Sequence, residues 1–220
     1  MQDVSQALFD RSDPGIDQII FNDLRAAYDT YLDTQMLSGT GANGQHLGVR
    51  AVTSPNTVSY TTATPTAAGL TPKLYDAIQQ IASNRHAPAE VIVMHPRRAA
   101  WLASNLSSTF PLFQVGGLNQ AAGTQDIGAL ITVSGLRVVS DSNVGILYGA
   151  STTEDEIYVC RVSDMHLWEG PLQARVMPEV GSGTMTVRLM LHGYSAFASG
   201  RAAKGISILS GTGVIAPTFA

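Results

Sequence analysis

Three acid and base side chains lie close together late in the chain, and their types are those that transfer protons in enzymes. Asp164, His166 and Glu169 would form an acid–base group if the fold brought them together. Asp164 and His166 stand two residues apart, however, and that spacing on a strand more often gives a half-exposed edge. The edge interpretation is favoured, and a small α+β hydrolase using these residues is the least favoured function.

A glycine pattern and a single cysteine are the next candidates for chemistry. Residues 39–44 spell G-x-G-x-x-G, which binds dinucleotides when it follows a strand and opens a helix. Here it follows a predicted helix and opens a loop, so a turn is favoured. Cys160 lies in the apolar alternation of residues 157–160, which predicts a buried small hydrophobe rather than a nucleophile. A lone cysteine also excludes a disulfide within this chain.

The histidines show no spacing of paired metal ligands on one helix or in one short loop. They are His46, His86, His95, His166 and His192. The sequence also lacks a phosphate-binding G-x-x-x-x-G-K-[ST] loop, an H-E-x-x-H pair and a G-x-S-x-G elbow. We therefore predict no catalytic, metal-binding or cofactor-binding residues.

Composition narrows the class of protein further. Hydrophobic residues make up 45% and charged residues 14% of the chain, with 21 glycines, which indicates a folded, turn-rich protein. The net charge of -4, without a dense basic run, gives no electrostatic footprint for nucleic acid. Arg97 and Arg98 are interpreted as a solvated helix start. Without a run of ~20 apolar residues or a signal peptide, we expect a soluble chain made in a cytoplasm.

The longest predicted element is an amphipathic helix over residues 13–38. Asp13 fits the N-cap, Pro14 the first helical position and Gly39 the C-terminal cap. Apolar side chains recur at spacings of three and four, which predicts one buried face. They are Ile16, Ile19, Ile20, Leu24, Ala27, Tyr28, Tyr31 and Leu32.

Shorter elements follow this helix. The Gly- and Thr-rich residues 39–69 predict loops, and a Thr-Pro pair opens a helix over 71–84. The apolar run at 91–94 predicts a central strand, and a third helix is expected at 97–106. Residues 107–128 predict a long exposed loop with a few apolar anchors.

The last third of the chain reads as β-structure. Alternating strands at 172–180 and 185–192 predict a β-hairpin with its turn region at 179–184. Further strands are predicted at 129–133, 136–140, 146–148, 157–162, 194–198 and 205–209. A long helix, then mixed elements, then antiparallel strands indicates an α+β fold rather than a doubly wound sheet.

The order of these parts carries a family resemblance. A lead-in at residues 4–10 precedes the long helix, which ends in Tyr31-Leu32-Asp33, and a glycine turn follows at 39–49. Residues 91–96 (VIVMHP) match a strand that the family commonly writes as hydrophobic-Met-Asn-Pro, and residues 135–141 and 188–198 match two later strands. The chain thus resembles the major capsid proteins of tailed phages, with the Hong Kong 97-type fold.

This resemblance implies a domain organisation and contact residues. A peripheral domain would comprise residues 1–50 and 167–200, with the spine helix at 13–38 and the long β-hairpin, and an axial mixed α/β domain would comprise 51–166 and 201–220. Two groups of residues would contact neighbouring subunits. They are Phe110, Leu112, Phe113 and Val115 around the capsomer axis, and Glu179, Val180, Ser182 and Thr184 where three capsomers meet.

The resemblance also implies a function. The chain would be a non-enzymatic structural subunit of a bacteriophage capsid, made in the host cytoplasm, assembling with copies of itself into pentamers and hexamers and enclosing DNA without reading it. An encapsulin-like compartment shell is the alternative. Family members carry an extended N-terminal segment and a long two-stranded loop before the spine helix, whereas twelve residues precede Asp13 here. We therefore expect a truncated or processed form with weakened assembly and, since the hairpin turn lacks Asn, no covalent cross-link.

Overall fold

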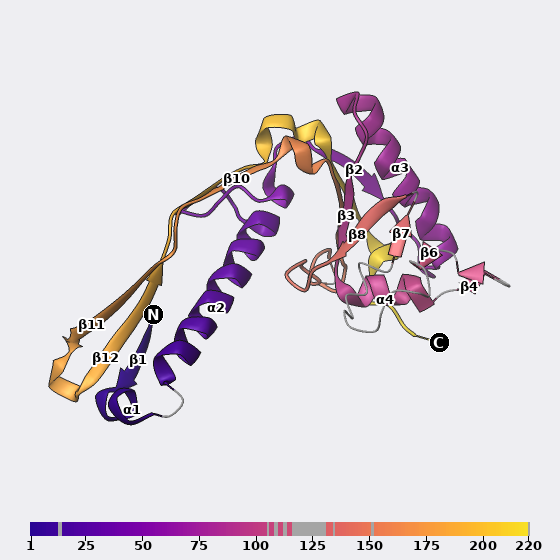
Figure 1. Ribbon diagram of the computed structural model, residues 1–220. Coiled ribbons are helices and arrows are strands. Elements are labelled where there is room, and N and C mark those ends of the chain that lie inside the picture. The colour runs from indigo at the N-terminus through magenta and orange to yellow at the C-terminus, as the bar shows by residue number, and fades with distance from the viewer. Residues whose placement is uncertain are drawn as a thin grey trace.

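A long helix and a narrow hairpin extend together from a broad sheet, so the molecule is elongated (Figure 1). The computed structural model describes residues 1–12, 15–104, 106–107, 110–111, 114–115, 131–133, 135–150 and 152–219. All statements below about structure concern these residues.

Helix α2 (Ile16–Ser38) occupies most of the residues predicted as the long helix. The predicted cap Asp13 and the predicted first helical residue Pro14 lie outside the described residues. The first helical N–H, that of Ile16, donates to Ser12 Oγ at 2.9 Å. A side-chain oxygen therefore caps this helix end, although it comes from Ser12.

The predicted buried apolar face of α2 is covered only in part. Within the described helix only Ile20 and Leu32 are buried, whereas the side chains of Ile19 and Tyr31 are 45% and 59% exposed. The reason is that α2 packs on one side against a narrow sheet, which is too small to cover a wide apolar stripe.

The narrow sheet contains the predicted β-hairpin, which is confirmed as β11 (Gln173–Gly181) and β12 (Thr186–His192). Strand β1 (Gln2–Ser5) pairs antiparallel with β12, so the strand order is β1-β12-β11. Helix α1 (Gln6–Arg11) follows β1 and precedes α2. We call these elements, residues 1–38 and 173–192, the arm. The arm has a small apolar cluster of its own, made of Val4, Ile20, Val187 and Leu189.

A seven-stranded sheet forms the other end of the molecule, which we call the sheet body. Its order is β2 (Asn56–Ser59), β14 (Ile206–Ser210), β9 (Ile157–Cys160), β3 (Val91–Met94), β8 (Leu136–Ser140), β7 (Ile131–Val133) and β6 (Gln114–Val115). Strand β3 lies in the middle, as predicted, and pairs parallel with β8 and antiparallel with β9. The mixed sheet agrees with the predicted α+β class.

Short strands complete the described β-structure. Strand β10 (His166–Glu169) pairs antiparallel with β13 (Ser195–Ala198), and this pair lies between the arm and the sheet body (Figure 1). Strand β4 (Leu106–Ser107) pairs with β5 (Phe110–Pro111). Most of the loop predicted at 107–128 lies outside the described residues.

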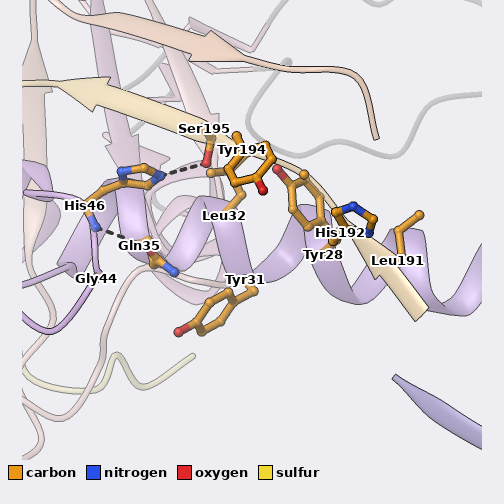
Figure 2. A pocket seen from close by; sticks show the side chains of 11 residues that line it. Tyr28, Tyr31, Leu32, Gln35, Gly44, His46, Leu191, His192, Tyr194 and Ser195 are labelled. Carbon is orange, nitrogen blue, oxygen red and sulfur yellow. Dashed lines mark hydrogen bonds between the residues drawn. The ribbon is translucent and has the colours of Figure 1, made fainter. Parts of the chain in front are cut away.

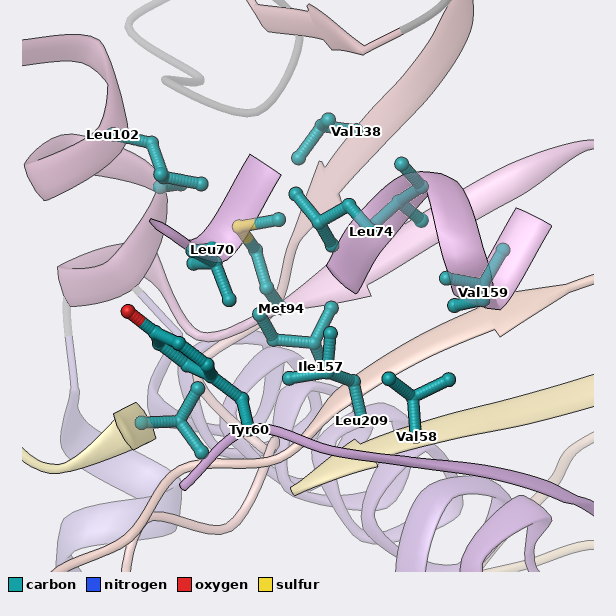
Figure 3. Close-up of a cluster of buried hydrophobic side chains, with 14 of the residues drawn as sticks. Val58, Tyr60, Leu70, Leu74, Met94, Leu102, Val138, Ile157, Val159 and Leu209 are labelled. Carbon is teal, nitrogen blue, oxygen red and sulfur yellow. The ribbon is translucent and has the colours of Figure 1, made fainter. Parts of the chain in front are cut away.

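The main apolar core lies on the face of the sheet body that helices α3 (Ala67–Arg85) and α4 (Pro96–Ser104) cover (Figure 3). Leu70 and Leu74 of α3 meet Met94, Ile157 and Leu209 of the sheet there. A second cluster on the opposite face includes Val49, Val52, Val144, Tyr158, Cys160, Ile206 and Ile208. Because β9 contributes to both clusters, all four of its residues are buried.

Three predicted boundaries in the sheet body are corrected. Helix α3 begins at Ala67, four residues before the predicted Thr71, because Thr66 Oγ1 accepts a hydrogen bond from Gly69 N at 3.1 Å and caps the helix. Residues 56–59, predicted as loop, form β2 because they pair with β14, far away in the chain. Residues 146–148, predicted as a strand, form only an isolated bridge between Tyr148 and Glu154.

Candidate functional site

The residues proposed for a hydrolase do not form a catalytic group. Asp164 Oδ2 and Oδ1 accept hydrogen bonds from Arg85 at 2.8 and 2.9 Å, and Arg161 lies 3.6 Å away. The hydrogen bonds from Arg85 lower the pKa of Asp164, so this carboxylate is a poor base. The ring of His166 lies instead beside that of Trp168 in the same strand, with centroids 5.7 Å apart and the planes tilted by 45°. Asp164 therefore belongs to a structural ion pair.

Cys160 is buried, as predicted, and burial raises the pKa of its thiol to about 12. The thiol is therefore protonated at neutral pH, which makes it inert as a nucleophile. No three His, Cys, Asp or Glu side chains in the described ranges converge into a group that could hold a metal ion. Within those ranges, too, every helix falls short of the length or the apolar character that crossing a bilayer requires.

The glycine pattern at residues 39–44 forms a tight turn, as predicted. Gly41 N donates to His46 O at 3.0 Å, and Gly48 N donates to Gly39 O at 2.9 Å. Gly41 has a positive φ of 73°, a conformation that favours glycine. A Cβ at Gly39 would collide with the carbonyl oxygens of Gln35 and His46. These glycines thus allow the chain to leave α2 and turn sharply towards the sheet body.

A cavity of about 420 Å³ lies between α2 and the junction of β12 with β13 (Figure 2). It is lined by Tyr28, Tyr31, Leu32, Gln35, Gly44, His46, Leu191, His192, Gly193, Tyr194 and Ser195. His46 Nε2 lies 2.9 Å from Ser195 Oγ, a pairing that also occurs between a nucleophile and its base. The lining contains no carboxylate to orient the imidazole, so this contact acts as a tie between the glycine turn and β13.

The interpretation of Arg97 and Arg98 as a solvated helix start is wrong. Arg98 and Asp155 are fully buried, and Arg98 Nε and Nη2 donate to Asp155 Oδ2 at 3.1 and 2.9 Å. Arg97 donates to the other carboxylate oxygen, and Arg98 also donates to Ile215 O. Arg98 therefore joins α4 both to the buried carboxylate of Asp155 and to the C-terminal segment. The acidic run at residues 154–156 was the sequence signal for these two cations.

The predicted contact residues lie in two places. Glu179, Val180 and Thr184 are exposed at the tip of the hairpin, and Ser182 begins the short helix η4 (Ser182–Thr184) between the strands. Sequence reasoning missed Met185, which follows this turn with a positive φ and a side chain 70% exposed. The turn-forming residues Gly183 and Thr184 directly before Met185 were the local sequence signal for its exposure.

The other predicted contacts belong to the segment after α4. Phe110 lies in β5 and Val115 in β6, where Val115 pairs with Ile131. Leu112 and Phe113 lie outside the described residues. Large apolar side chains are also exposed elsewhere on the surface, and they include Leu147, Trp168 and Tyr194. Exposed apolar residues that stand singly are common on protein surfaces, so these residues alone do not identify an interface.

Comparisons with known proteins agree with this architecture. The sequence model of the phage capsid family matches residues 1–178. The capsid of an empty GTA particle is 17% identical with a TM-score of 0.69, over 96% of this chain and 71% of that one. The structure from Gordonia phage Cozz is 15% identical with a TM-score of 0.65, over 96% and 68% of the two chains.

A compartment protein has a similar fold. The holo-SrpI encapsulin complex from Synechococcus elongatus PCC 7942 is 14% identical with a TM-score of 0.65, over 99% of this chain and 73% of that one. No curated protein matches the sequence. At these identities the likenesses show the fold, which is the predicted Hong Kong 97-type capsid fold.

Proposed function

This chain belongs to the phage capsid family and is a major capsid protein, and from that premise we propose that its copies pack sideways into pentamers and hexamers that enclose DNA. The observation that best supports the proposal is the exposed apolar surface at both ends of an elongated molecule. Val180 and Met185 are exposed at the tip of the arm, and Leu147 is 69% exposed on the sheet body. Contact with neighbouring subunits would remove these apolar side chains from water.

We propose that the arm and the sheet body correspond to two capsid domains. Residues 1–50 and 167–200 would be peripheral, and residues 51–166 and 201–220 would be axial. Separate apolar clusters support this division for the arm, since Val4, Ile20, Val187 and Leu189 pack together there. Val49, near the end of the first peripheral range, packs instead in the second cluster on the sheet body. Each part therefore has a core around which it can fold.

The eight predicted contact residues fit this proposal. Glu179, Val180, Ser182 and Thr184 would meet neighbours where three capsomers join, because a hairpin tip at the end of an arm reaches furthest from the sheet body (Figure 1). Phe110, Leu112, Phe113 and Val115 would lie around the capsomer axis. A closed ring needs two different complementary faces on each subunit, and we propose one group of contact residues for each face.

The subunit would act without catalysis and would enclose DNA without reading its sequence. The carboxylate of Asp164 and the thiol of Cys160, the side chains with the chemistry for catalysis, are held in an ion pair and in the core. The net charge of -4 gives no strong attraction to phosphates, so contacts with DNA would be few. The protein would be made in the cytoplasm of a bacterial host and would end in the virion.

Electron microscopy of the purified chain tests the assembly proposal, and analysis of what purified particles contain tests the enclosure of DNA. We expect ring-shaped pentamers and hexamers, and any closed shells should contain nucleic acid rather than protein. Val180→Asp at the hairpin tip should reduce particle formation, while Tyr75→Asp, at a similarly exposed apolar residue of α3 in the sheet body, should reduce it less. Particles filled with protein cargo would favour the encapsulin-like alternative, and a monomer at all concentrations would contradict both.

A further inference from the structure

The outer face of α2 is open to solvent along most of the helix. Ile19, Asp23, Ala26, Asp29 and Thr30 are all exposed, and helical spacing places them opposite the buried side chains of Ile20 and Leu32. Small side chains at the middle of this face leave the backbone close to the surface. Another surface can therefore approach the backbone of the helix closely. Ile19, Asp23 and Asp29 lie beside these small residues.

This face carries a negative charge that the arm does not neutralise. The residues of the arm include eight carboxylates, seven aspartates and Glu179, but only four arginines. On α2 itself, Arg25 is the cation beside the outer face, and its Nε is 4.0 Å from Asp29 in a highly exposed pair. Exposed pairs of this kind contribute little, so the helix keeps a net negative field.

A cluster with the opposite charge lies where the sheet body meets the arm. Arg85 and Arg161 converge on Asp164, and Arg161 also lies 3.8 Å from Glu90. The helix η5 (Gly200–Gly205) packs beside them against α3 and the short helix η3 (Val162–Asp164). It adds two exposed cations, Arg201 and Lys204. The cluster therefore has four cations and two carboxylates.

The two cations of η5 are the part of the cluster that a partner can reach. Arg201 lies near enough to Asp164 for its charge to help lower the pKa of that carboxylate, after the larger effects of Arg85 and Arg161. Lys204 Nζ donates only a long hydrogen bond, 3.5 Å, to Pro55 O. Both side chains are exposed, so another surface can reach them.

We propose that the open outer face of α2 in one copy docks against the basic surface of η5 in a neighbouring copy. This inference rests on the proposed function, because it assigns one of the contacts between subunits. The two surfaces differ and belong to different parts of the chain, which is the arrangement that head-to-tail rings require. Opposite charges would steer the encounter and fix the register, while Ile19 and the small residues make the close contact.

Charge reversal tests the proposal directly. One variant carries Asp23→Lys and Asp29→Lys, and the other carries Arg201→Glu and Lys204→Glu. A matched control carries Asp10→Lys and Glu169→Lys, which makes the same change in net charge as the first variant at exposed positions outside both surfaces. Sedimentation velocity of each purified protein measures association, and circular dichroism verifies that each one folds.

We expect each reversed variant alone to associate roughly tenfold or more weakly than the wild type, because like charges then face each other. An equimolar mixture of the two variants should recover association, since each reversed surface meets a reversed partner. Association of the wild type should also weaken when salt rises from about 0.1 M to about 1 M, as the Debye length falls from about 10 Å to about 3 Å. The control should behave like the wild type.

The outcomes separate this inference from the proposed function. If the wild type assembles and both reversed variants assemble equally well, the docking of α2 on η5 is wrong and the capsid proposal stands. If the reversed variants fail alone and the mixture also fails, the two surfaces do not face each other, which again overturns the inference. A wild type that never associates contradicts the proposed function and the inference together.

Discussion

At the scale of single residues, the buried group around Asp155 is the feature that sequence reasoning judged wrongly. Arg98 is separated from Asp155 by 57 positions, so no local pattern connects the two. A pair of arginines before a helical run is usually solvated, whereas here a distant carboxylate compensates their burial. The identity of Cys160 as a core residue was predictable because it belongs to a short apolar run.

Replacing Arg98 by alanine should lower the free energy of unfolding by about 3–5 kcal/mol, because Asp155 would keep a buried charge with one partner fewer. Urea denaturation followed by circular dichroism measures this change. Arg25→Ala, which removes an exposed arginine from α2, should change the free energy by less than about 0.5 kcal/mol. Equal effects of the two substitutions would show that the buried pair has no special role.

Asp33 gives a prediction about pH. Burial, followed by the charges of Asp141 and Asp29, raises the pKa of Asp33 above its ordinary value. The folded state therefore favours the protonated form of Asp33. The free energy of unfolding falls as pH rises through the raised pKa of the folded state, because the carboxylate then becomes charged. Asp33→Asn should stabilise the protein at pH 7 but not at pH 3, as thermal unfolding at both values measures. Asp23→Asn, at an exposed position, should lack this difference, and an Asp33→Asn effect independent of pH would refute the prediction.

At the scale of elements, the kinds and order of the helices and strands were largely predictable, while several boundaries were not. The hairpin β11–β12 and the central strand β3 follow from alternating and continuous apolar runs. Strand β2 depends on pairing with β14, nearly 150 residues later, which no local pattern shows. Thr66 was overlooked as a cap because Pro72 gave a stronger apparent start.

Thr66→Ala should cost about 1 kcal/mol of stability, because Gly69 N would lose its side-chain acceptor at the start of α3. Thr64→Ala, two residues earlier at an exposed position, should leave stability nearly unchanged. Chemical denaturation of the two variants in parallel distinguishes them. A helix that truly began at Thr71 would give no difference between them.

At the scale of the whole molecule, the arrangement of the arm and the sheet body could be expected from the family resemblance but not from local patterns. The exposure of α2 illustrates why. Its apolar periodicity indicates a surface to be covered, but the sequence does not say whether this chain or a neighbour covers it. Ile19 and Tyr31 fit the apolar pattern and are exposed in the single chain.

Val4→Ala should loosen the arm and leave the sheet body intact, because Val4 packs only in the small cluster with Ile20, Val187 and Leu189. Hydrogen–deuterium exchange should rise several-fold in β1 and β12, while exchange in β3 stays at its original rate. Ala99→Gly, in the core of the sheet body, should give the reverse pattern. A rise throughout the chain after Val4→Ala would mean that the two parts unfold as one unit.

The junction at the end of α2 has a mechanical consequence. Three separate passages of the backbone connect the arm to the sheet body: the glycine turn after Ser38, strand β10 and strand β13. Strands β10 and β13 are paired, and the side chain of His46 contacts that of Ser195. These contacts make the three connecting segments move together. We expect the arm to rock about a single line rather than swivel freely. A building block with one such degree of freedom can adopt the slightly different inclinations that flat and sharply curved regions of a closed container demand.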